Sequence, residues 1–428
     1  MAVPQISDSF LIYQPKMVKV GNQNTLTPGL WQDQLQKLNN ILTTAPAAPP
    51  AAQGINNTSH PGVGSDEVPA VPERHGKVLG ADNFLKADQY PGLHSKWLQD
   101  GRVKHPQPLI EGAPNYRELG EGIHGTAQPT IDGMRSVLQR AGSGPGGKIK
   151  SVWTNLREEP VVYINGKPLN LRHIKAPYNN QASPGRSDRE EDQLEKQLKQ
   201  DILKEAQRNG GYIITHDEDA GPPPKVVEKK VKLETVQTVG EVYKQLQTEG
   251  YNVEYKRLPV TDMKKPEDHD IDELVKFLKK QDPDSELIFN CHAGQGRTTT
   301  AMVLASIIRR GQMGDSSKIL KDANLREDIK EQGDHRTKNY RPIMQAIRDT
   351  QKLLSSQEDA DEVIARYGDV QNLKEEVGKA RKSADSKTDP QARQRAQDKV
   401  MDYLERYHTI ITFDRYAQEQ GPDFKISY

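Results

Sequence analysis

The sequence has one cysteine, no excess of either charge and no long apolar run, and each of these absences excludes a class of protein. A single thiol, Cys291, cannot form an internal disulfide, which excludes a disulfide scaffold and indicates a reducing, cytoplasmic location. Lys plus Arg and Asp plus Glu number 60 each, so no overall field favours nucleic acid or an anionic membrane as a partner. No stretch approaches the length of about 20 apolar residues that crosses a bilayer.

Residues 1–75 are predicted to be a disordered leader. Their second half is rich in Pro, Ala, Gly, Asn and Ser, a composition that cannot build a packed face. The start of the chain also lacks the charged and then apolar pattern of a secretory signal. The composition leaves open that this leader is an address for a specialised bacterial secretion system, which would make the protein an effector.

Beyond the leader, short strand patterns alternate with helical patterns, which is typical of an α/β domain. Strands are predicted at residues 151–154, 161–164, 212–216, 251–258 and 287–289. The turn signal Asn165-Gly166 predicts a hairpin. A helix with glycine-containing termination is predicted over 187–208, and its many Glu, Gln and Lys residues indicate a solvated outer face. Residues 341–428 are charged and helical in pattern, with an interruption near 383–390, and we expect them to pack on the domain.

The residues from Cys291 to Arg297 form the strongest chemical motif. They follow the predicted strand 287–289 and precede a helical pattern, with Gly294 and Gly296 between them. Glycines here let the chain curl around a small anion, toward which amide groups and the helix dipole would point. Arg297 would hold two phosphate oxygens with its planar fork. The same field favours the thiolate of Cys291, which predicts a nucleophile for phosphoryl transfer through a phosphocysteine.

The plainer alternative for this motif is a buried core cysteine beside a glycine turn. A phosphocysteine mechanism also needs an acid that protonates the leaving oxygen. Such an acid is expected on a loop after a strand, and Asp262 lies directly after the predicted strand 251–258. Asp268 and Asp270 compete for this role, although they fit the start of the next helix better. We therefore predict Asp262 as the general acid.

Several stretches resemble the cysteine phosphatases of the protein-tyrosine-phosphatase superfamily, and within it the phytase-like and paladin-like branch. They are NCHAGQGRTTTAMVLA from Asn290, PVTDMKKP from Pro259, HGTAQPT from His124 and WTNLREEP from Trp153. The resemblance covers residues 114–341 well and the C-terminal helices loosely. It implies a mixed sheet flanked by helices over residues 76–340. Asn290 stands where these enzymes usually carry a histidine.

The resemblance implies that Cys291 is the nucleophile, Arg297 the phosphate ligand and Asp262 the general acid. It implies that the hydroxyl of Thr298 aids turnover of the phosphoenzyme. Further substrate contacts are expected from the loop and from a strand-end arginine: His292, Ala293, Gly294, Gln295, Gly296 and Arg157. Lys264 and Lys265 beside the acid would add positive charge near a polyanion, unless they are an ordinary solvated pair.

These residues favour hydrolysis of inositol polyphosphates, phytate in particular. A phosphatase acting on phosphotyrosine or on a dual set of phosphoproteins stays open, and so does a catalytically silent phosphate-binding module. We expect no cofactor and no metal, because thiolate phosphatases need none. The acidic clusters 216–219 and 267–270 lack a recognised metal-ligand spacing and are interpreted as solvated loop acids. The glycine-rich stretch 142–149 imitates a nucleotide phosphate loop but carries Ile149 where Ser or Thr would bind magnesium.

Overall fold

The computed structural model describes residues 18–20, 23–25, 79–80, 82–90, 93, 109–118, 120–181, 185–221, 223–312, 356–368, 370–425 and 427–428. The chain divides into two units, residues 1–55 and 56–428. In the first unit, β1 (Val18–Val20) and β2 (Gln23–Thr25) form an antiparallel pair. The rest of the predicted leader up to residue 75 lies outside the described residues. The elements below belong to the second unit.

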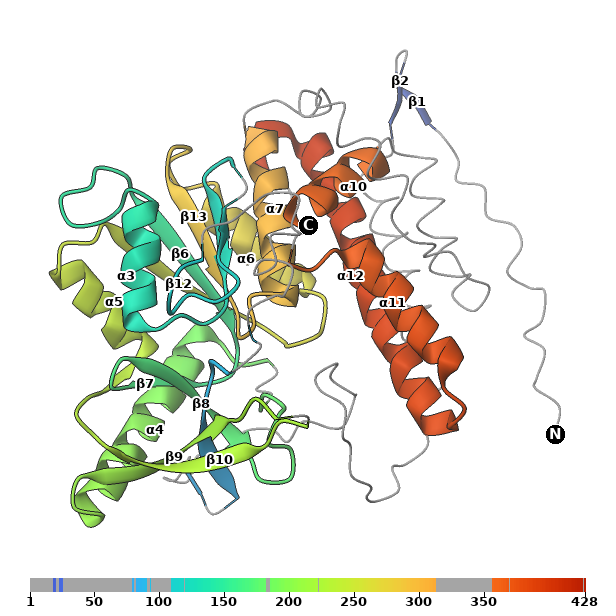
Figure 1. Cartoon of the computed structure of the whole chain (residues 1–428). Helices are drawn as coiled ribbons and strands as arrows, with labels where there is room; N and C mark the ends of the chain where they lie inside the picture. Colours follow the sequence, from blue (N-terminus) through green and yellow to red (C-terminus); the bar gives the residue numbers. More distant parts are fainter. Residues whose placement is uncertain are drawn as a thin grey trace. The chain divides into compact units, whose positions relative to one another are not determined.

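A five-stranded sheet forms the centre of the α/β domain (Figure 1). Its strand order is β12 (Val253–Val260), β6 (Ser151–Arg157), β13 (Glu286–Asn290), β5 (Ile123–Thr126) and β4 (Arg117–Glu118). The first four strands pair in parallel and β4 is antiparallel, so the predicted mixed sheet is confirmed. Every residue of β6 is buried, as expected for a parallel strand covered on both faces.

Helices cover both faces of this sheet (Figure 1). On one face lie α3 (Ile131–Arg140) and α5 (Val239–Thr248), and on the other lie α6 (Asp268–Leu278) and α7 (Gly296–Gln312). The core on the α3 and α5 side is centred on Trp153 and Ile288. Helix α5 starts with a capping box, in which Thr238 and Glu241 each bond the other's backbone amide.

A second, six-stranded sheet lies beside the domain core. Its order is β10 (Val226–Lys232), β9 (Tyr212–Glu218), β3 (Asn83–Ala87), β8 (Lys167–His173), β7 (Val161–Ile164) and β11 (Val236–Thr238). The β7–β8 hairpin turns at Asn165 and Gly166, both with positive φ, as the turn signal predicts. Helix α4 (Asp188–Arg208) packs Leu194, Leu198 and Ile202 against this sheet.

Two expectations about solvated acids are wrong in part. On α4, Glu191 and Glu195 are fully buried. Glu195 Oε1 accepts hydrogen bonds from Arg257 Nη2 at 2.6 Å and from the amide of Val161 at 3.1 Å. Glu218, from the cluster 216–219, is also buried, with its carboxylate 2.8 Å from the ammonium of Lys86. Basic partners far away in the sequence make burial of Glu195 and Glu218 tolerable, and the local sequence pattern does not reveal such partners.

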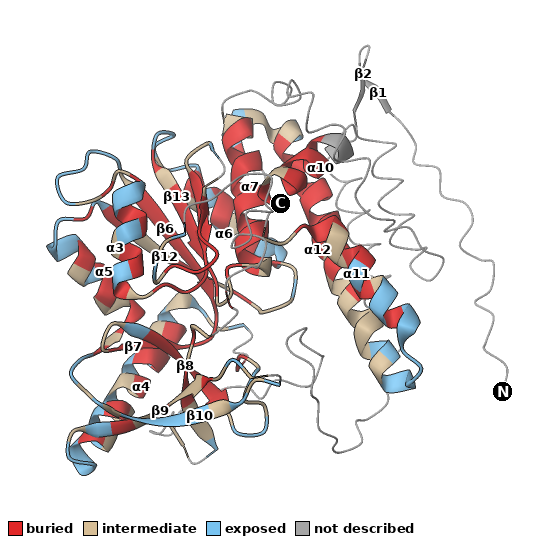
Figure 2. Cartoon of the chain, in the orientation of Figure 1, coloured by how far each residue is buried: buried red, intermediate tan, exposed pale blue. Residues whose placement is uncertain are grey.

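The C-terminal region is helical, as predicted. It contains α10 (Ser356–Tyr367), α11 (Leu373–Ser386), α12 (Pro390–Gln420) and the short 3₁₀ helix η3 (Gly421–Asp423). The expected interruption separates α11 from α12, which starts with Asp389 as its cap and proline at its first position. The second half of α12 is buried against α7 and its neighbours (Figure 2). Among the described residues, no helix is both long and apolar enough to span a membrane.

Candidate active site

The loop from Cys291 to Gln295 joins the end of β13 to the start of α7. Cys291 is buried, with 4% of its surface exposed. Gly294 has φ of +68°, and a Cβ at this position would lie 2.4 Å from the amide nitrogen of Ala127. Both facts require glycine here, because an L side chain would be strained and would collide with backbone. The predicted curl of the chain between strand and helix is therefore present.

Three successive carbonyl groups of this loop are held by the segment around β4 and β5. The carbonyl of His292 accepts from the amide of Gln128 at 3.0 Å. Asn115 Nδ2 donates to the carbonyl of Ala293 at 2.8 Å, and Arg117 Nη1 donates to that of Gly294 at 2.8 Å. Among the described residues, none accepts a hydrogen bond from the amides of residues 292–295. Free amides next to the start of a helix form a binding site for a tetrahedral anion.

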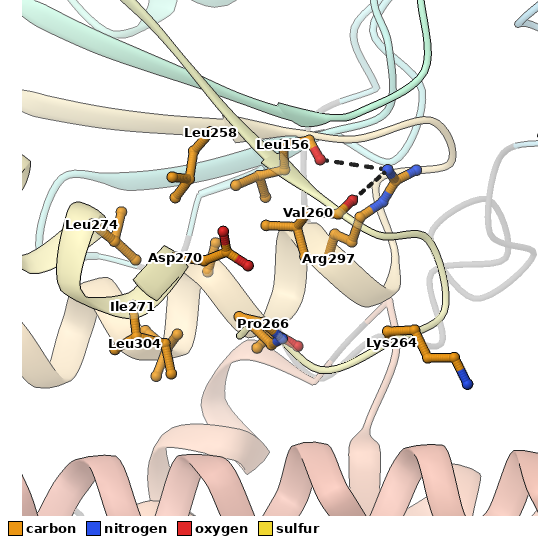
Figure 3. A pocket seen from close by; sticks show the side chains of 12 residues that line it. Leu156, Leu258, Val260, Lys264, Pro266, Asp270, Ile271, Leu274, Arg297 and Leu304 are labelled. Carbon is orange, nitrogen blue, oxygen red and sulfur yellow. Dashed lines mark hydrogen bonds between the residues drawn. The ribbon is translucent and has the colours of Figure 1, made fainter. Parts of the chain in front are cut away.

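Arg297 lies in the first turn of α7 and is buried. Its Nη1 and Nη2 each donate to one oxygen of Glu159 at 2.9 Å, and Nη1 also reaches the carbonyls of Val260 and Leu156 (Figure 3). Burial by itself would lower the pKa of Arg297, but the carboxylates of Asp262 and Glu159 outweigh it and hold the pKa well above its usual value. Arg297 Nε has no hydrogen-bond partner among the described residues. The guanidinium is thus a fixed cation whose Nε–H can still donate a hydrogen bond.

Asp262 is brought to this cation by the end of β12. Between Arg257 and Val260 the pairing of β12 with β6 shifts register at Pro259, a residue that an edge strand tolerates. Just beyond this irregularity, Asp262 Oδ1 lies 3.2 Å from Arg297 Nη2. Asp262 Oδ2 accepts from Asn180 Nδ2 at 2.7 Å, while about a third of the side chain stays exposed, 35%.

The competing acids lie at the start of α6, as expected. Asp270 belongs to the capping box of that helix, and its Oδ2 accepts from the amide of Glu267 at 2.9 Å. Asp268 occupies the first helical position. Of the three acids, Asp262 is the one for which the structure gives an ion pair with Arg297 among the described residues. This geometry favours Asp262 as the acid.

Two adjacent carboxyl groups of the site were not anticipated. Burial raises the pKa of Glu159, but the charges of Arg297 and Arg157 outweigh it and hold the pKa well below its usual value. Burial raises the pKa of Glu158 to about 7, and the negative charge of Glu159 adds to the rise. Glu158 Oε2 accepts from the hydroxyl of Thr261, the residue before the predicted acid. The one indication of these carboxyl groups in the sequence is that two acidic residues directly follow the strand β6, whose residues are all buried in the structure.

The remaining predicted site residues have different surroundings. Arg157 is fully buried, with Nη1 at 2.5 Å from Asp88 and Nε at 2.9 Å from Glu159, so it lies behind Arg297. His292 Nε2 is 3.5 Å from Asp88 Oδ1, and burial together with nearby arginines holds its pKa well below the usual value. Thr298 is buried, and its hydroxyl has no partner among the described residues.

The loop residues and the two lysines are more open. Ala293, Gln295 and Gly296 are half-buried, so this side of the loop is accessible. Lys264 is largely exposed and pairs with Asp402 at 3.0 Å. Lys265 lies 3.7 Å from Glu267, toward the start of α6. Their predicted contacts with substrate stay predictions.

Asn290, the residue before the predicted nucleophile Cys291, makes hydrogen bonds through both polar atoms of its side-chain amide. Its Oδ1 accepts from the indole of Trp153 at 2.9 Å, and its Nδ2 donates to Gln128 at 2.9 Å and to Asn155 at 3.2 Å. The backbone amide of Gln128 in turn donates to the carbonyl of His292, which connects these hydrogen bonds to the loop. The asparagine therefore fixes the end of β13 through hydrogen bonds on both of its amide atoms.

A hollow lies beside the loop that follows β12 and carries Asp262, which we call the acid loop (Figure 3). Its lining is mostly apolar and comes from the ends of β6 and β12 and from α6 and α7, with Asp270, Lys264 and Arg297 as charged members. Neither Cys291 nor Asp262 lines it. We therefore assign the chemistry to the loop and not to this hollow.

Comparison with known proteins finds a matching family model and several relatives. Residues 154–309 match the family model described as PTP-like phytase, inositol hexakisphosphate. Paladin from Gallus gallus is 30% identical over 196 residues, 45% of this chain and 21% of paladin. Paladin from Homo sapiens is 26% identical over 321 residues, 72% of this chain and 34% of paladin. The chain thus spans a minor part of these relatives' length.

More distant similarities extend the comparison. The effector protein hopD2 of Pseudomonas syringae is 24% identical over 184 residues, 43% of this chain and 36% of hopD2. The tandemly repeated protein tyrosine phosphatase like phytase from Mitsuokella multacida superposes with a TM-score of 0.50 at 19% identity, over 84% of this chain and 48% of that one. At that identity the likeness concerns the fold. Over residues 154–309 the chain is therefore similar to the PTP-like phytases, and over a wider range it is similar to the paladins.

Proposed function

We propose that the protein is a cysteine-dependent phosphomonoesterase that hydrolyses inositol polyphosphates, with phytate as the favoured substrate. The observation that carries the proposal is the loop of Cys291, whose carbonyls are held from behind and whose amides are free among the described residues, beside the fixed cation of Arg297. Such a loop binds the three non-bridging oxygens of a phosphate and places phosphorus above the sulfur.

The reaction follows from these groups in two steps. The thiolate of Cys291 attacks phosphorus, the bond to the leaving oxygen breaks, and Asp262 gives that oxygen its proton. Water then attacks the phosphocysteine, Asp262 takes a proton from it, and inorganic phosphate and the thiolate are released. The fixed donors of the loop and Arg297 stabilise the charge on the phosphoryl oxygens in both steps. We assign Thr298 to the second step, since its buried hydroxyl has no other partner among the described residues.

Inositol polyphosphate is favoured as the substrate class for three reasons. The matched family model is described by inositol hexakisphosphate. A structural neighbour, the PTP-like myo-inositol phosphatase from Mitsuokella multacida, was solved with myo-inositol-(1,3,4,5)-tetrakisphosphate. Lys264, exposed on the acid loop, supplies positive charge that a polyanion would use. A phosphoprotein phosphatase and a silent phosphate-binding module are the alternatives that the experiment must separate.

The decisive experiment compares the wild type with Cys291→Ser. We expect phosphate release from inositol hexakisphosphate by the wild type and complete loss in Cys291→Ser, with binding of the substrate retained. Equal residual rates in the two proteins would overturn the enzyme proposal and leave the silent module. Faster release from a phosphotyrosine peptide than from inositol hexakisphosphate would instead favour the protein phosphatase.

The proposed chemistry requires Cys291 to stay reduced, which supports a reducing, cytoplasmic site of action. Delivery as a bacterial effector stays a prediction, supported by the similarity to hopD2. A test is whether mild peroxide abolishes phosphate release and a thiol reductant restores it, since Cys291 is the one thiol of the chain. Activity that peroxide leaves unchanged would speak against the thiolate mechanism.

A further inference from the structure

Arg406 of α12 lies between the acid loop and the first residue of α7. It is buried, with 2% of its surface exposed. Its Nη2 donates to the carbonyl of Met263, the residue after Asp262, at 3.4 Å. Its Nη1 lies 2.8 Å from where a Cβ on Gly296 would be, so the guanidinium fills the space that this glycine leaves. One side chain thus touches both the loop of the predicted acid and the helix that carries Arg297.

Burying the guanidinium of Arg406 costs free energy, and the direct contacts of this group offset only part of that cost. Burial lowers the pKa of Arg406, and its Nε has no hydrogen-bond partner among the described residues. The guanidinium lies over the ring of Tyr403 at 4.9 Å, and the carboxylates of Asp402, Asp262 and Glu376 partly offset the burial. A long apolar side chain would fill the same space at lower cost, so packing alone does not explain an arginine here.

The acid loop makes a second contact with the same helix. Lys264 pairs with Asp402, which lies one helical turn before Arg406 on α12. Between these two contacts, Met263 has φ of +66°, a backbone conformation that a residue with a side chain rarely adopts. Such a turn persists when its surroundings hold it, and residues in this state are concentrated at functional sites.

We propose that Arg406 is a positioning residue for the general acid. By holding the carbonyl of Met263 against the start of α7, it fixes where Asp262 stands relative to Arg297 and the bound phosphate. Asp402 supports the same loop through Lys264. This inference rests on the proposed function and adds to it that the C-terminal helix is part of the machinery for proton transfer.

The leaving group separates this role from a structural one. An inositol alkoxide needs a proton to leave, whereas the phenolate of p-nitrophenyl phosphate leaves without one. For Arg406→Gln we expect the first-turnover rate on inositol hexakisphosphate to fall about tenfold or more, with KM little changed and the first-turnover burst of p-nitrophenolate nearly unchanged. First turnovers are compared because the second step, in which Asp262 takes a proton from water, is the same for both substrates. Arg415→Gln is the matched control, because Arg415 pairs with Glu419 on the same helix, away from the loop. It should leave both rates unchanged.

Three outcomes would overturn the inference. The first is an equal fall on both substrates in folded Arg406→Gln, which would indicate general damage to the site. The second is a further fall when Arg406→Gln is added to Asp262→Asn, since a residue that acts through Asp262 has nothing left to position. If Arg406→Gln fails to fold, Asp402→Asn replaces it, because this variant removes the partly exposed ion pair with Lys264. The third outcome is that Asp402→Asn shows no selective loss on inositol hexakisphosphate. Failure of the proposed function would show separately, as wild-type rates that do not depend on Cys291.

Discussion

At the scale of single residues, the site is defined by how Arg297 divides its contacts. Glu159 accepts hydrogen bonds from both Nη groups, and Asp262 Oδ1 lies 3.2 Å from Nη2. Glu159 therefore anchors the arginine within the fold, whereas Asp262 stays partly exposed and can exchange its contact for a substrate. This division leaves Arg297 Nε for a phosphate oxygen, since no described residue accepts from it.

The role of Asp262 can be tested by removing its proton. For Asp262→Asn we expect phosphate release from inositol hexakisphosphate to fall about a hundredfold or more at neutral pH, because the amide cannot protonate an alkoxide. The loss in the first-turnover burst of p-nitrophenolate should be much smaller, because that step needs no proton on the leaving group. Asp268→Asn is the matched control, since it removes the same charge at the start of α6. An unchanged rate in Asp262→Asn, with a fall in Asp268→Asn, would move the acid to Asp268.

At the scale of elements, the sequence predicted what depends on local chemistry. The hairpin at Asn165-Gly166 and the strand, loop and helix around Cys291 all follow from neighbouring residues. The residues that hold the site in place do not follow from their sequence neighbours. Arg117 is 177 residues away from Gly294, to whose carbonyl it donates, and Arg406 is 143 residues away from Met263, to whose carbonyl it donates. No periodicity or spacing links such pairs, so these residues could not be assigned from one sequence.

The close packing of α7 on β5 sets where Arg297 and Thr298 stand. A Cβ on Gly125 of β5 would lie 2.4 Å from Met302 Sδ and 2.8 Å from Thr298 Cγ2. Gly125→Ala should therefore push α7 from the sheet, lower the free energy of unfolding by about 1–3 kcal/mol and reduce phosphate release. Urea unfolding and the assay on inositol hexakisphosphate measure the two effects.

Gly240 of α5 offers the matched substitution. No atom lies within 4 Å of a Cβ built there, and the residue is helical. Gly240→Ala should raise the free energy of unfolding by up to about 1 kcal/mol, because alanine loses less backbone entropy in a helix, and should leave activity unchanged. If Gly125→Ala were as stable and as active as Gly240→Ala, the tight contact between β5 and α7 would not be needed for the site.

At the scale of the whole molecule, buried ionisable groups in separate elements link stability to pH. Burial is the main cause that raises the pKa of Glu158 to about 7, of Asp414 to about 7 and of Glu191 to about 8. In an unfolded chain these carboxyls lose their protons near pH 4 to 4.5. The folded protein therefore holds protons that the unfolded chain has lost, and its stability falls as pH rises toward the folded pKa values.

The buried histidines act in the opposite direction and over a lower pH range. Burial lowers the pKa of His408 to about 4, and burial with nearby arginines holds the pKa of His292 well below its usual value. Their contribution to stability grows as pH rises and is complete above about pH 6.5, where the unfolded histidines are neutral as well. Above that pH, the carboxyl groups are the part of this set that still changes stability.

The largest of these effects belongs to Glu191 of α4. Its two oxygens have no hydrogen-bond partner among the described residues, and Arg186 is 3.6 Å away, so a neutral carboxyl suits the site. The free energy of unfolding of the wild type should fall between pH 6.5 and 8.5, and Glu191→Gln should remove about 2 kcal/mol of that fall, because the amide never ionises. Urea titrations of both proteins at these two pH values measure the difference. Parallel curves would show that Glu191 ionises at the same pH in the folded and unfolded chains, which its burial beneath the second sheet argues against.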